Sequence, residues 1–318
     1  MAKTKGFHAL PSTLRKDIYD FLECWKKSIA GDGSPPGLIY HYCDANALLN
    51  IFRTKSMWAT GARYLNDSSE LVAVLRNLPE TTAKYRKTRT GALLAESTEV
   101  MRTTGAHMLS HAIGMESYVA CFSEDPDILS QWRVYADDGI GFAIGFNAQK
   151  LRAVSGKLKT ATIRRMVYSG EDEQRLLDSL FEGLGAILKP HIRLFGPSTE
   201  RLSNTTAHPR TWLSVRLSEA LYELTIQCKH HSFREEKEWR IQPAATSTQF
   251  RISRGRLVPY TVLDMTSTSS DRLMPIEEIV IGPKANRLDT ERVLMYLGEE
   301  YGYGHSGFKI SQSEAPYR

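Results

Sequence analysis

The 318-residue chain contains no apolar run close to the length that a membrane-spanning helix needs, about 18 residues or more. Its N-terminus, MAKTKGFHALPSTLRKD, has no apolar segment of the kind that signal peptides carry. Only four cysteines occur and none forms a CxxC pair, which argues against a disulfide framework and against a cysteine zinc site. We therefore expect a cytoplasmic protein that does not engage a membrane.

Two phosphate-binding motifs are also missing. The chain has neither GxGxxG nor a P-loop, so neither a Rossmann dinucleotide site nor a P-loop NTPase is supported. The net charge, 41 basic minus 36 acidic residues, is +5, which is only mildly basic. Basic residues gather at 150–165 and 251–256, and this pattern suits either an anionic partner or a solvated surface.

The pattern of apolar residues predicts an α+β fold. A helix is expected over 12–29, followed by the linker GDGSPPG at 31–37, and a polar helical insertion at about 79–115. Strands without regular βαβ alternation favour a mostly antiparallel sheet with helical insertions. The predicted organisation is an N-terminal helix and linker over 1–37 and a single domain over 38–318. Strands are predicted at 38–42, 56–60, 117–123, 139–146 and 160–168, and in EWRIQP, RLVPYTVLDM, EEIVIGP and FKISQS.

Aromatic residues surround a histidine in the first predicted strand, Tyr40-His41-Tyr42. Strand side chains alternate, so His41 faces away from its two tyrosines. A histidine in this position is either a hydrogen-bonded core residue or a neutral imidazole that donates to a sugar hydroxyl in a cleft. Further on, the residues that follow Tyr64 are typical of a helix N-cap, whereas Tyr64 itself is free to stack on a ring.

A predicted strand end at Ser123 is followed by Gln131, Trp132 and Arg133, which gather several donors and an aromatic ring at one rim. Arg133 suits a phosphate group, because a guanidinium binds it through two hydrogen bonds. The alternative is that Trp132 belongs to the core and Arg133 forms a structural ion pair.

Two acids occur two residues apart in Glu236-Lys237-Glu238. Strand alternation predicts that Glu236 and Glu238 share one face. Like charges on one face repel each other, so such a pair is unfavourable unless it has a function. The pair is either part of a site or part of a solvated edge strand.

The ordered blocks of the chain resemble the bacterial domain-of-unknown-function family 2971. These blocks span about residues 38–318, and the family label implies no chemistry. They are IYHY, ALLNIF, MWAT, YLNDSSEL, CFSED, LSQWRVYADDGIGFAIGF, EEKEWRI, IVIGP and SEAPYR.

The opening Tyr-His-Tyr strand, helix and MWAT strand also resemble the ADP-ribosyltransferase fold, a split and mostly antiparallel sheet. That resemblance implies an NAD-dependent catalytic domain in which His41 fills the first-strand position and Ser123 (or Tyr64) the middle one. Glu238, with Glu236 two residues before it, fills the late-strand acid position. A carboxylate near the ribose stabilises the positive charge that develops as nicotinamide leaves.

Further roles follow from the same resemblance. Tyr64 or Trp132 stacks on nicotinamide, Arg133 offsets the diphosphate charge, and Glu236 positions or deprotonates the acceptor. Tyr42 and Gln131 complete the expected NAD site, and no metal is needed. The acceptor is RNA, DNA, a protein or water. We expect a toxin or phage-defence effector that is held off by an antitoxin protein.

Two other functions stay open. A metal-dependent nuclease is suggested by Glu235-x-Lys237 with Asp67 or Asp125 as a further acid for Mg²⁺. A non-catalytic binding module is the third reading, in which Trp58, Trp132 and Trp239 are simply core residues.

Overall fold

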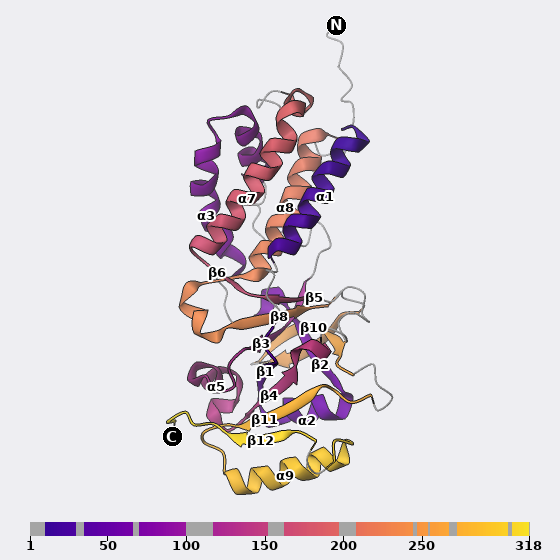
Figure 1. Ribbon diagram of the computed structural model, residues 1–318, viewed down its shortest axis with the longest axis vertical. Coiled ribbons are helices and arrows are strands. Elements are labelled where there is room, and N and C mark those ends of the chain that lie inside the picture. Colours follow the sequence, from indigo (N-terminus) through magenta and orange to yellow (C-terminus); the bar gives the residue numbers. More distant parts are fainter. Residues whose placement is uncertain are drawn as a thin grey trace. The chain divides into compact units, whose positions relative to one another are not determined.

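The computed structural model describes ten stretches of the chain, which divide between two compact units. The described residues are 10–29, 35–65, 70–99, 117–151, 162–196, 208–243, 247–253, 255–266, 272–304 and 307–317. A helical unit groups residues 1–32, 66–115 and 167–231, and a sheet unit groups residues 33–65, 116–166 and 232–318. Figure 1 labels the elements of both.

The helical unit is a bundle of antiparallel and parallel neighbours drawn from three separate parts of the chain. Apolar residues of α1 recur every three or four positions and form one buried stripe that includes Trp25, whose indole N–H donates to the Leu176 carbonyl at 3.1 Å. Helix α8 is buried on most sides and therefore occupies the centre of the bundle. The elements of the helical unit are α1 Ser12–Ile29, α3 Glu70–Tyr85, α7 Glu171–Leu188, η3 Lys189–Phe195, α8 Pro209–Gln227, and the short parallel pair β6 Val167–Tyr168 and β7 Cys228–Lys229.

The sheet unit is built on ten strands. The main path runs β12-β11-β4-β1-β3-β2-β10-β9, while β8 pairs with β3 and β5 pairs with β8. All of these pairs are antiparallel except β11 with β12. The strands are β1 Leu38–Cys43, β2 Ser56–Gly61, β3 Tyr118–Ser123, β4 Phe142–Asn147, β5 Thr162–Arg165, β8 Glu238–Gln242, β9 Gln249–Ser253, β10 Arg256–Asp264, β11 Ile276–Ile281 and β12 Lys309–Gln312.

Each face of the sheet packs against helices. Helices α2 (Ala45–Thr54) and α9 (Arg287–Glu300) contribute to the main core on one face, which also contains Phe122 and Trp239. Helix α5 (Leu129–Tyr135) packs on the other face, against Tyr40 and Tyr42. The remaining short helices of the unit are η1 Ala62–Tyr64, η2 Asp137–Gly139 and η4 His231–Glu236, the last of which starts at the unit boundary.

Strand β3 is the branch point of the sheet. Its pairing with β1 is at Ser123, and its pairing with β2 is at Tyr118 and Val119. Ser123 of β3 pairs with both β1 and β8, so these two strands lie on opposite edges of β3. The edge of β3 between the β1 and β2 pairings, around Cys121, is therefore not bridged by the backbone of either strand. We call this place the split.

Most elements agree with the sequence prediction. The helix over 12–29 is confirmed, and the helical insertion is confirmed over 79–99, whereas 100–115 lie outside the described residues. The predicted strand at 160–168 is two strands, because β5 joins the sheet and β6 joins the helical unit. The N-terminal helix and the insertion, expected as separate additions to one domain, group together with 167–231. Among the described helices, none has the length and apolar composition that crossing a bilayer requires.

Candidate functional site

The imidazole of His41 fills the split. Its Nδ1 lies 3.0 Å from the carbonyl oxygen of Cys121 on β3. A carbonyl can only accept, so Nδ1 carries the proton, and in the neutral ring Nε2 is left as an acceptor. Burial lowers the pKa of His41, and the positive charge of Arg251 lowers it further, against the opposing effect of the Cys121 hydrogen bond. His41 is therefore a neutral, oriented hydrogen-bond acceptor at neutral pH.

A second feature, the Arg251 cluster, consists of Arg251, Thr60, Trp58 and Tyr260. Arg251 donates from Nη2 to the Thr60 hydroxyl at 2.9 Å, and its guanidinium carbon lies 5.6 Å from the centre of the Trp58 ring. Trp58 packs on Tyr260 with ring centres 4.5 Å apart. The Nε of Arg251 is buried and has no hydrogen-bond partner among the described residues. The cluster thus combines a cation that has a spare donor with an aromatic ring that is 39% exposed.

The strand register places this cluster on one face of the sheet together with Glu238. Residues directly opposite in an antiparallel pair share a face, and so do residues two apart in one strand. Thr60 lies opposite both Tyr260 and Val119, and Glu238 lies opposite Ser123. Val119 and Ser123 are four residues apart in β3. Glu238 and Thr60 are therefore on the same face, about 10 Å apart across two strand spacings and about 13 Å apart along β3.

The two acids predicted for the site, Glu238 and Glu236, lie in different surroundings. Glu238 is 4% exposed, and Arg240 on the same face donates to it from Nε at 2.8 Å and from Nη2 at 3.3 Å. Both side chains are almost fully buried, so the two residues form an internal ion pair. Glu238 is at once a member of this pair and a candidate site residue. Of the two alternatives for Glu238, the solvated edge strand is wrong, because β8 lies between β3 and β5.

Glu236 is not in a strand. It ends the 3-10 helix η4, and Lys237 after it has a left-handed backbone with φ 42°, so β8 begins only at Glu238. The predicted alternation that places Glu236 and Glu238 on one strand face is therefore wrong. The Glu236 side chain is buried, and its backbone carbonyl accepts from the Ser123 hydroxyl at 2.7 Å.

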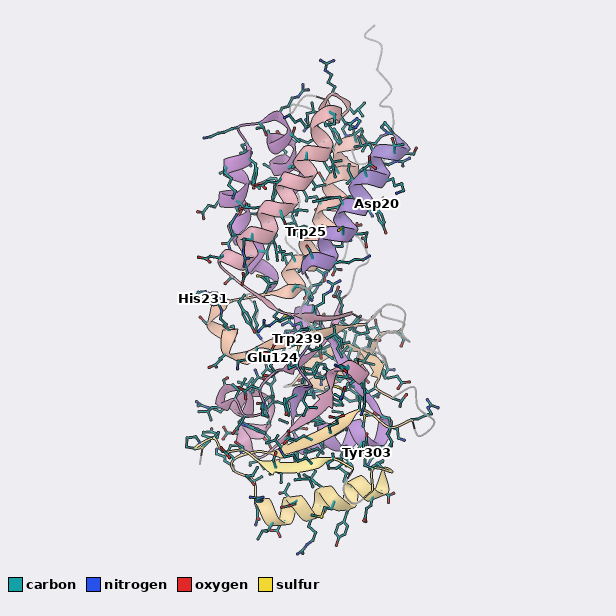
Figure 2. The ribbon with its side chains drawn as sticks, viewed as in Figure 1. Asp20, Trp25, Glu124, His231, Trp239 and Tyr303 are labelled. Atoms are coloured by element: carbon teal, nitrogen blue, oxygen red, sulfur yellow. The ribbon has the colours of Figure 1, made fainter. Side chains whose placement is uncertain are left out.

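Ser123 has a structural role in this arrangement. Its hydroxyl donates to the Glu236 carbonyl and accepts from the Asp125 backbone N–H at 3.1 Å, and the residue is buried. These two bonds tie the end of β3 to η4. Glu124, the next residue, accepts from the Trp239 indole at 2.8 Å, and Figure 2 labels both side chains.

Two further predicted residues belong to the packing of α5. The Tyr42 hydroxyl donates to the Asp125 carbonyl and accepts from the Ile128 N–H, each at 2.9 Å. Trp132 is fully buried, meets Tyr42 edge-on at 4.9 Å and donates to Asp127 at 2.6 Å. A ring enclosed in this way has no open face for a ligand.

The remaining predicted residues lie in different surroundings. Gln131 is buried in α5, and Arg133 is exposed, with its guanidinium 5.7 Å from the Tyr317 ring. Tyr64, 38% exposed, follows β2 directly in η1 and so continues the strand that carries Trp58 and Thr60. Of the predicted residues, Glu238 therefore shares the face of the Arg251 cluster and Tyr64 follows a strand of that cluster, whereas His41 fills the split from the opposite face.

The residues suggested for a nuclease do not form a metal site in the described part of the chain, where no group of three or more His, Cys, Asp or Glu side chains is arranged to hold an ion. Glu235 accepts from the Ser130 hydroxyl at 2.7 Å, and Asp125 lies 3.5 Å from the Lys237 ammonium. Asp67 lies outside the described residues.

Sequence reasoning missed the Arg251 cluster as a unit. The sequence presents Arg251 only as part of the basic segment 251–256, and Trp58 only as a core residue of the non-catalytic alternative. Their approach depends on β10 pairing with both β2 and β9, far apart in the chain. Alternation in 249–253 gives the wrong face, because the apolar Phe250 and Ile252 are exposed while Arg251 is half-buried.

Comparisons with known proteins give a match to one family model over part of the chain, and no activity. Residues 131–241 match a protein-family model described as Protein of unknown function (DUF2971). The match supports the resemblance to that family over these residues, which include Trp132 and Glu238 but not His41. No curated protein and no solved structure matches the chain.

Proposed function

We propose that the sheet unit binds NAD along β3 at the split and transfers its ADP-ribose group, as in an ADP-ribosyltransferase. The observation that carries the proposal is the oriented, neutral His41 beside the Arg251 cluster. A ring acceptor, an arginine with a spare buried donor and an exposed indole are the groups that ribose hydroxyls, a diphosphate and a base recognise.

The order of these groups along β3 supports a dinucleotide rather than a mononucleotide. Glu238 lies level with Ser123, His41 meets Cys121, and Thr60 of the cluster lies level with Val119. An extended ligand on this face meets the Glu238 carboxylate at one end and the arginine and indole of the cluster at the other. His41 belongs to the opposite face by strand alternation, because its neighbour Tyr40 lies opposite Ser123, so its ring reaches such a ligand only through the split. In this arrangement Trp58 or Tyr64, not the buried Trp132, stacks on a base.

The chemistry assigned to Glu238 is stabilisation of charge. When the bond between the ribose C1′ and the nicotinamide nitrogen breaks, the electron pair leaves with nicotinamide and positive charge develops on the sugar. The acceptor nucleophile then bonds to C1′ and loses its proton. A fixed carboxylate lowers the energy of that charged state. Because Glu238 is buried and paired with Arg240, this role requires the substrate to displace whatever covers the carboxylate.

The acceptor in this proposal is RNA, DNA or a protein, and the cellular role is that of a toxin or phage-defence effector with an antitoxin partner. These parts rest on the resemblance alone. The site geometry bears on the donor, NAD, and not on the acceptor.

The test is nicotinamide release from NAD by the purified full chain, alone and with RNA, DNA or cell lysate. We expect release that falls about 100-fold per folded molecule in Glu238→Gln. Glu235→Gln, an exposed acid three residues away, is the matched control and should keep the wild-type rate. NAD binding without release under every condition would instead identify a binding module, and release unaffected by Glu238→Gln would remove the assigned role.

A further inference from the structure

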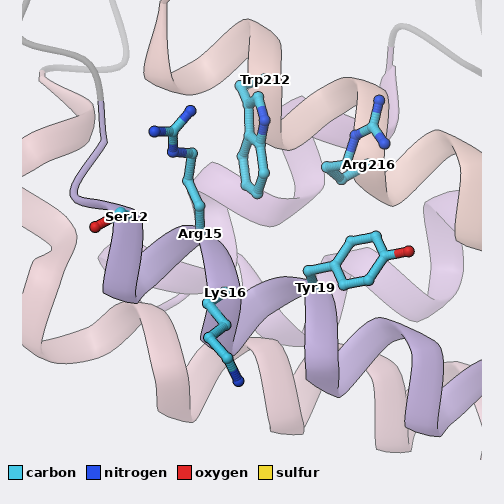
Figure 3. Close-up of a pocket in the computed structure, with 6 residues that line it drawn as sticks. All are labelled: Ser12, Arg15, Lys16, Tyr19, Trp212 and Arg216. Carbon is cyan, nitrogen blue, oxygen red and sulfur yellow. The ribbon is translucent and has the colours of Figure 1, made fainter.

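A shallow pocket of about 390 Å³ opens between α1 and α8 in the helical unit, which is separate from the proposed NAD site. Two helices that contact each other supply all of its walls. The lining residues, drawn in Figure 3, are Ser12, Arg15, Lys16, Tyr19, Trp212 and Arg216.

Three of the six lining side chains are cationic, and their charges are only partly balanced. Lys16 pairs with Asp20, and Arg216 donates from Nη2 to Glu219 at 2.8 Å. Within the described part of the chain, the Nε of Arg216 is nevertheless buried without a hydrogen-bond partner, and the Arg15 side chain makes no ion pair. The pocket therefore has positive charge and donors to spare, which suits an anionic ligand.

Two aromatic rings share the pocket with these cations. Figure 3 shows the indole of Trp212 between the side chains of Arg15 and Arg216, with the Tyr19 ring beside Arg216. Tyr19 is 51% exposed and Trp212 is half-buried, and neither ring stacks on another aromatic ring of the described residues. Neither ring is therefore committed to a stack with another aromatic ring of the described residues.

We propose that this pocket binds single-stranded nucleic acid, with phosphates on Arg15 and Arg216 and a base on Trp212 or Tyr19. A groove that alternates cations with open aromatic rings is the usual way in which proteins hold unpaired strands. A free phosphate or an acidic peptide would use the arginines but would leave the two rings unexplained. This inference does not depend on the proposed NAD activity.

The first test is fluorescence anisotropy of a labelled oligonucleotide of about 12 nucleotides, as RNA and as DNA, with the full chain. Arg15→Glu should weaken binding about tenfold or more, because it replaces a charged contact with a repulsion. Lys27→Glu is the matched control. It makes the same charge change on an exposed residue of α1, about 18 Å along the helix, and should change binding less than about twofold.

The salt dependence gives an independent readout. With three cations engaged, the slope of log K against log salt should be about −2, and Arg15→Glu should make it shallower by about 0.7 or more. Trp212→Phe keeps a ring for stacking and should bind within a few fold of wild type, whereas Trp212→Ala should lose about tenfold or more. Circular dichroism of each variant separates this loss from unfolding.

Three results would overturn the inference. The wild type could fail to bind either oligonucleotide, or Lys27→Glu could weaken binding as much as Arg15→Glu, which would indicate unspecific attraction to the basic surface. Poly-glutamate could also displace the oligonucleotide at equal charge concentration, which would identify the ligand as an acidic protein segment. Preference for RNA over DNA, or the reverse, would support the pocket and identify its ligand.

Discussion

Two arginines on one face of the sheet differ in how far their hydrogen-bond donors are satisfied by neighbouring residues. Arg240 is buried and makes two hydrogen bonds to the Glu238 carboxylate. Arg251 is partly exposed and donates from Nη2 to Thr60, and its buried Nε, beside a partly exposed indole, has no hydrogen-bond partner among the residues that the structure describes. The first environment is complete by itself, whereas the second lacks an acceptor. An incomplete polar environment next to an open ring is the better indication of a ligand site.

Two tryptophans differ in the same way, since one is enclosed by the protein and the other is partly exposed. Their replacement gives the largest expected difference in stability. Trp132→Ala removes a fully buried ring and should lower the free energy of unfolding by about 3–5 kcal/mol. Trp58→Ala removes a partly exposed ring and should cost less than about 2 kcal/mol. Urea denaturation followed by circular dichroism measures both, and equal losses would mean that Trp58 is as much a core residue as Trp132.

The Glu238–Arg240 pair gives the next effect. At an exposed position Glu238→Gln would leave folding nearly intact, but Glu238 is buried against Arg240. Removing one charge leaves Arg240 buried without its counter-ion, which should destabilise the fold by about 3 kcal/mol. Glu235→Gln makes the same chemical change at an exposed position and should stay within about 0.5 kcal/mol of wild type. Urea midpoints that coincide for the two variants would contradict the structural role of the pair.

The fold was predictable where neighbours in the chain determine it. The buried stripe of α1 and the continuous apolar character of β1 and β3 are local signals, and each predicted its element correctly. The split was not predictable in this way, because it depends on where β1 and β2 each leave β3.

The candidate site was predictable only in part for a related reason. His41 stood out because a polar residue interrupts an aromatic strand. Arg251 did not stand out, since its neighbours at the site come from β2 and β10 and not from its own segment. Conversely, Ser123 and Trp132 looked functional from sequence because polar bonds that tie them into turns and helices cannot be seen there.

His41 gives a smaller effect, which depends on pH. The fold lowers the pKa of His41 below its ordinary value of 6.5, so below that value the unfolded chain binds the proton more readily than the folded chain. Stability is therefore full at higher pH and is lost as pH falls, at no more than about 1.4 kcal/mol per pH unit.

His41→Asn removes this titration while its amide can still donate to the Cys121 carbonyl. The difference in unfolding free energy between the variant and the wild type should shift in favour of the variant from about pH 7 to about pH 5. A constant difference over that range would show that His41 does not titrate as the buried split requires.

The most direct measurement of the central claim is calorimetric titration of NAD into the wild type, Arg251→Ala and Arg256→Ala. Arg256 begins β10 on an exposed position of the same strand pair, so its removal changes the net charge equally without touching the cluster. The split site predicts that Arg251→Ala binds NAD about tenfold more weakly, while Arg256→Ala binds like the wild type. Equal affinities in all three proteins, or no binding by the wild type, would contradict it.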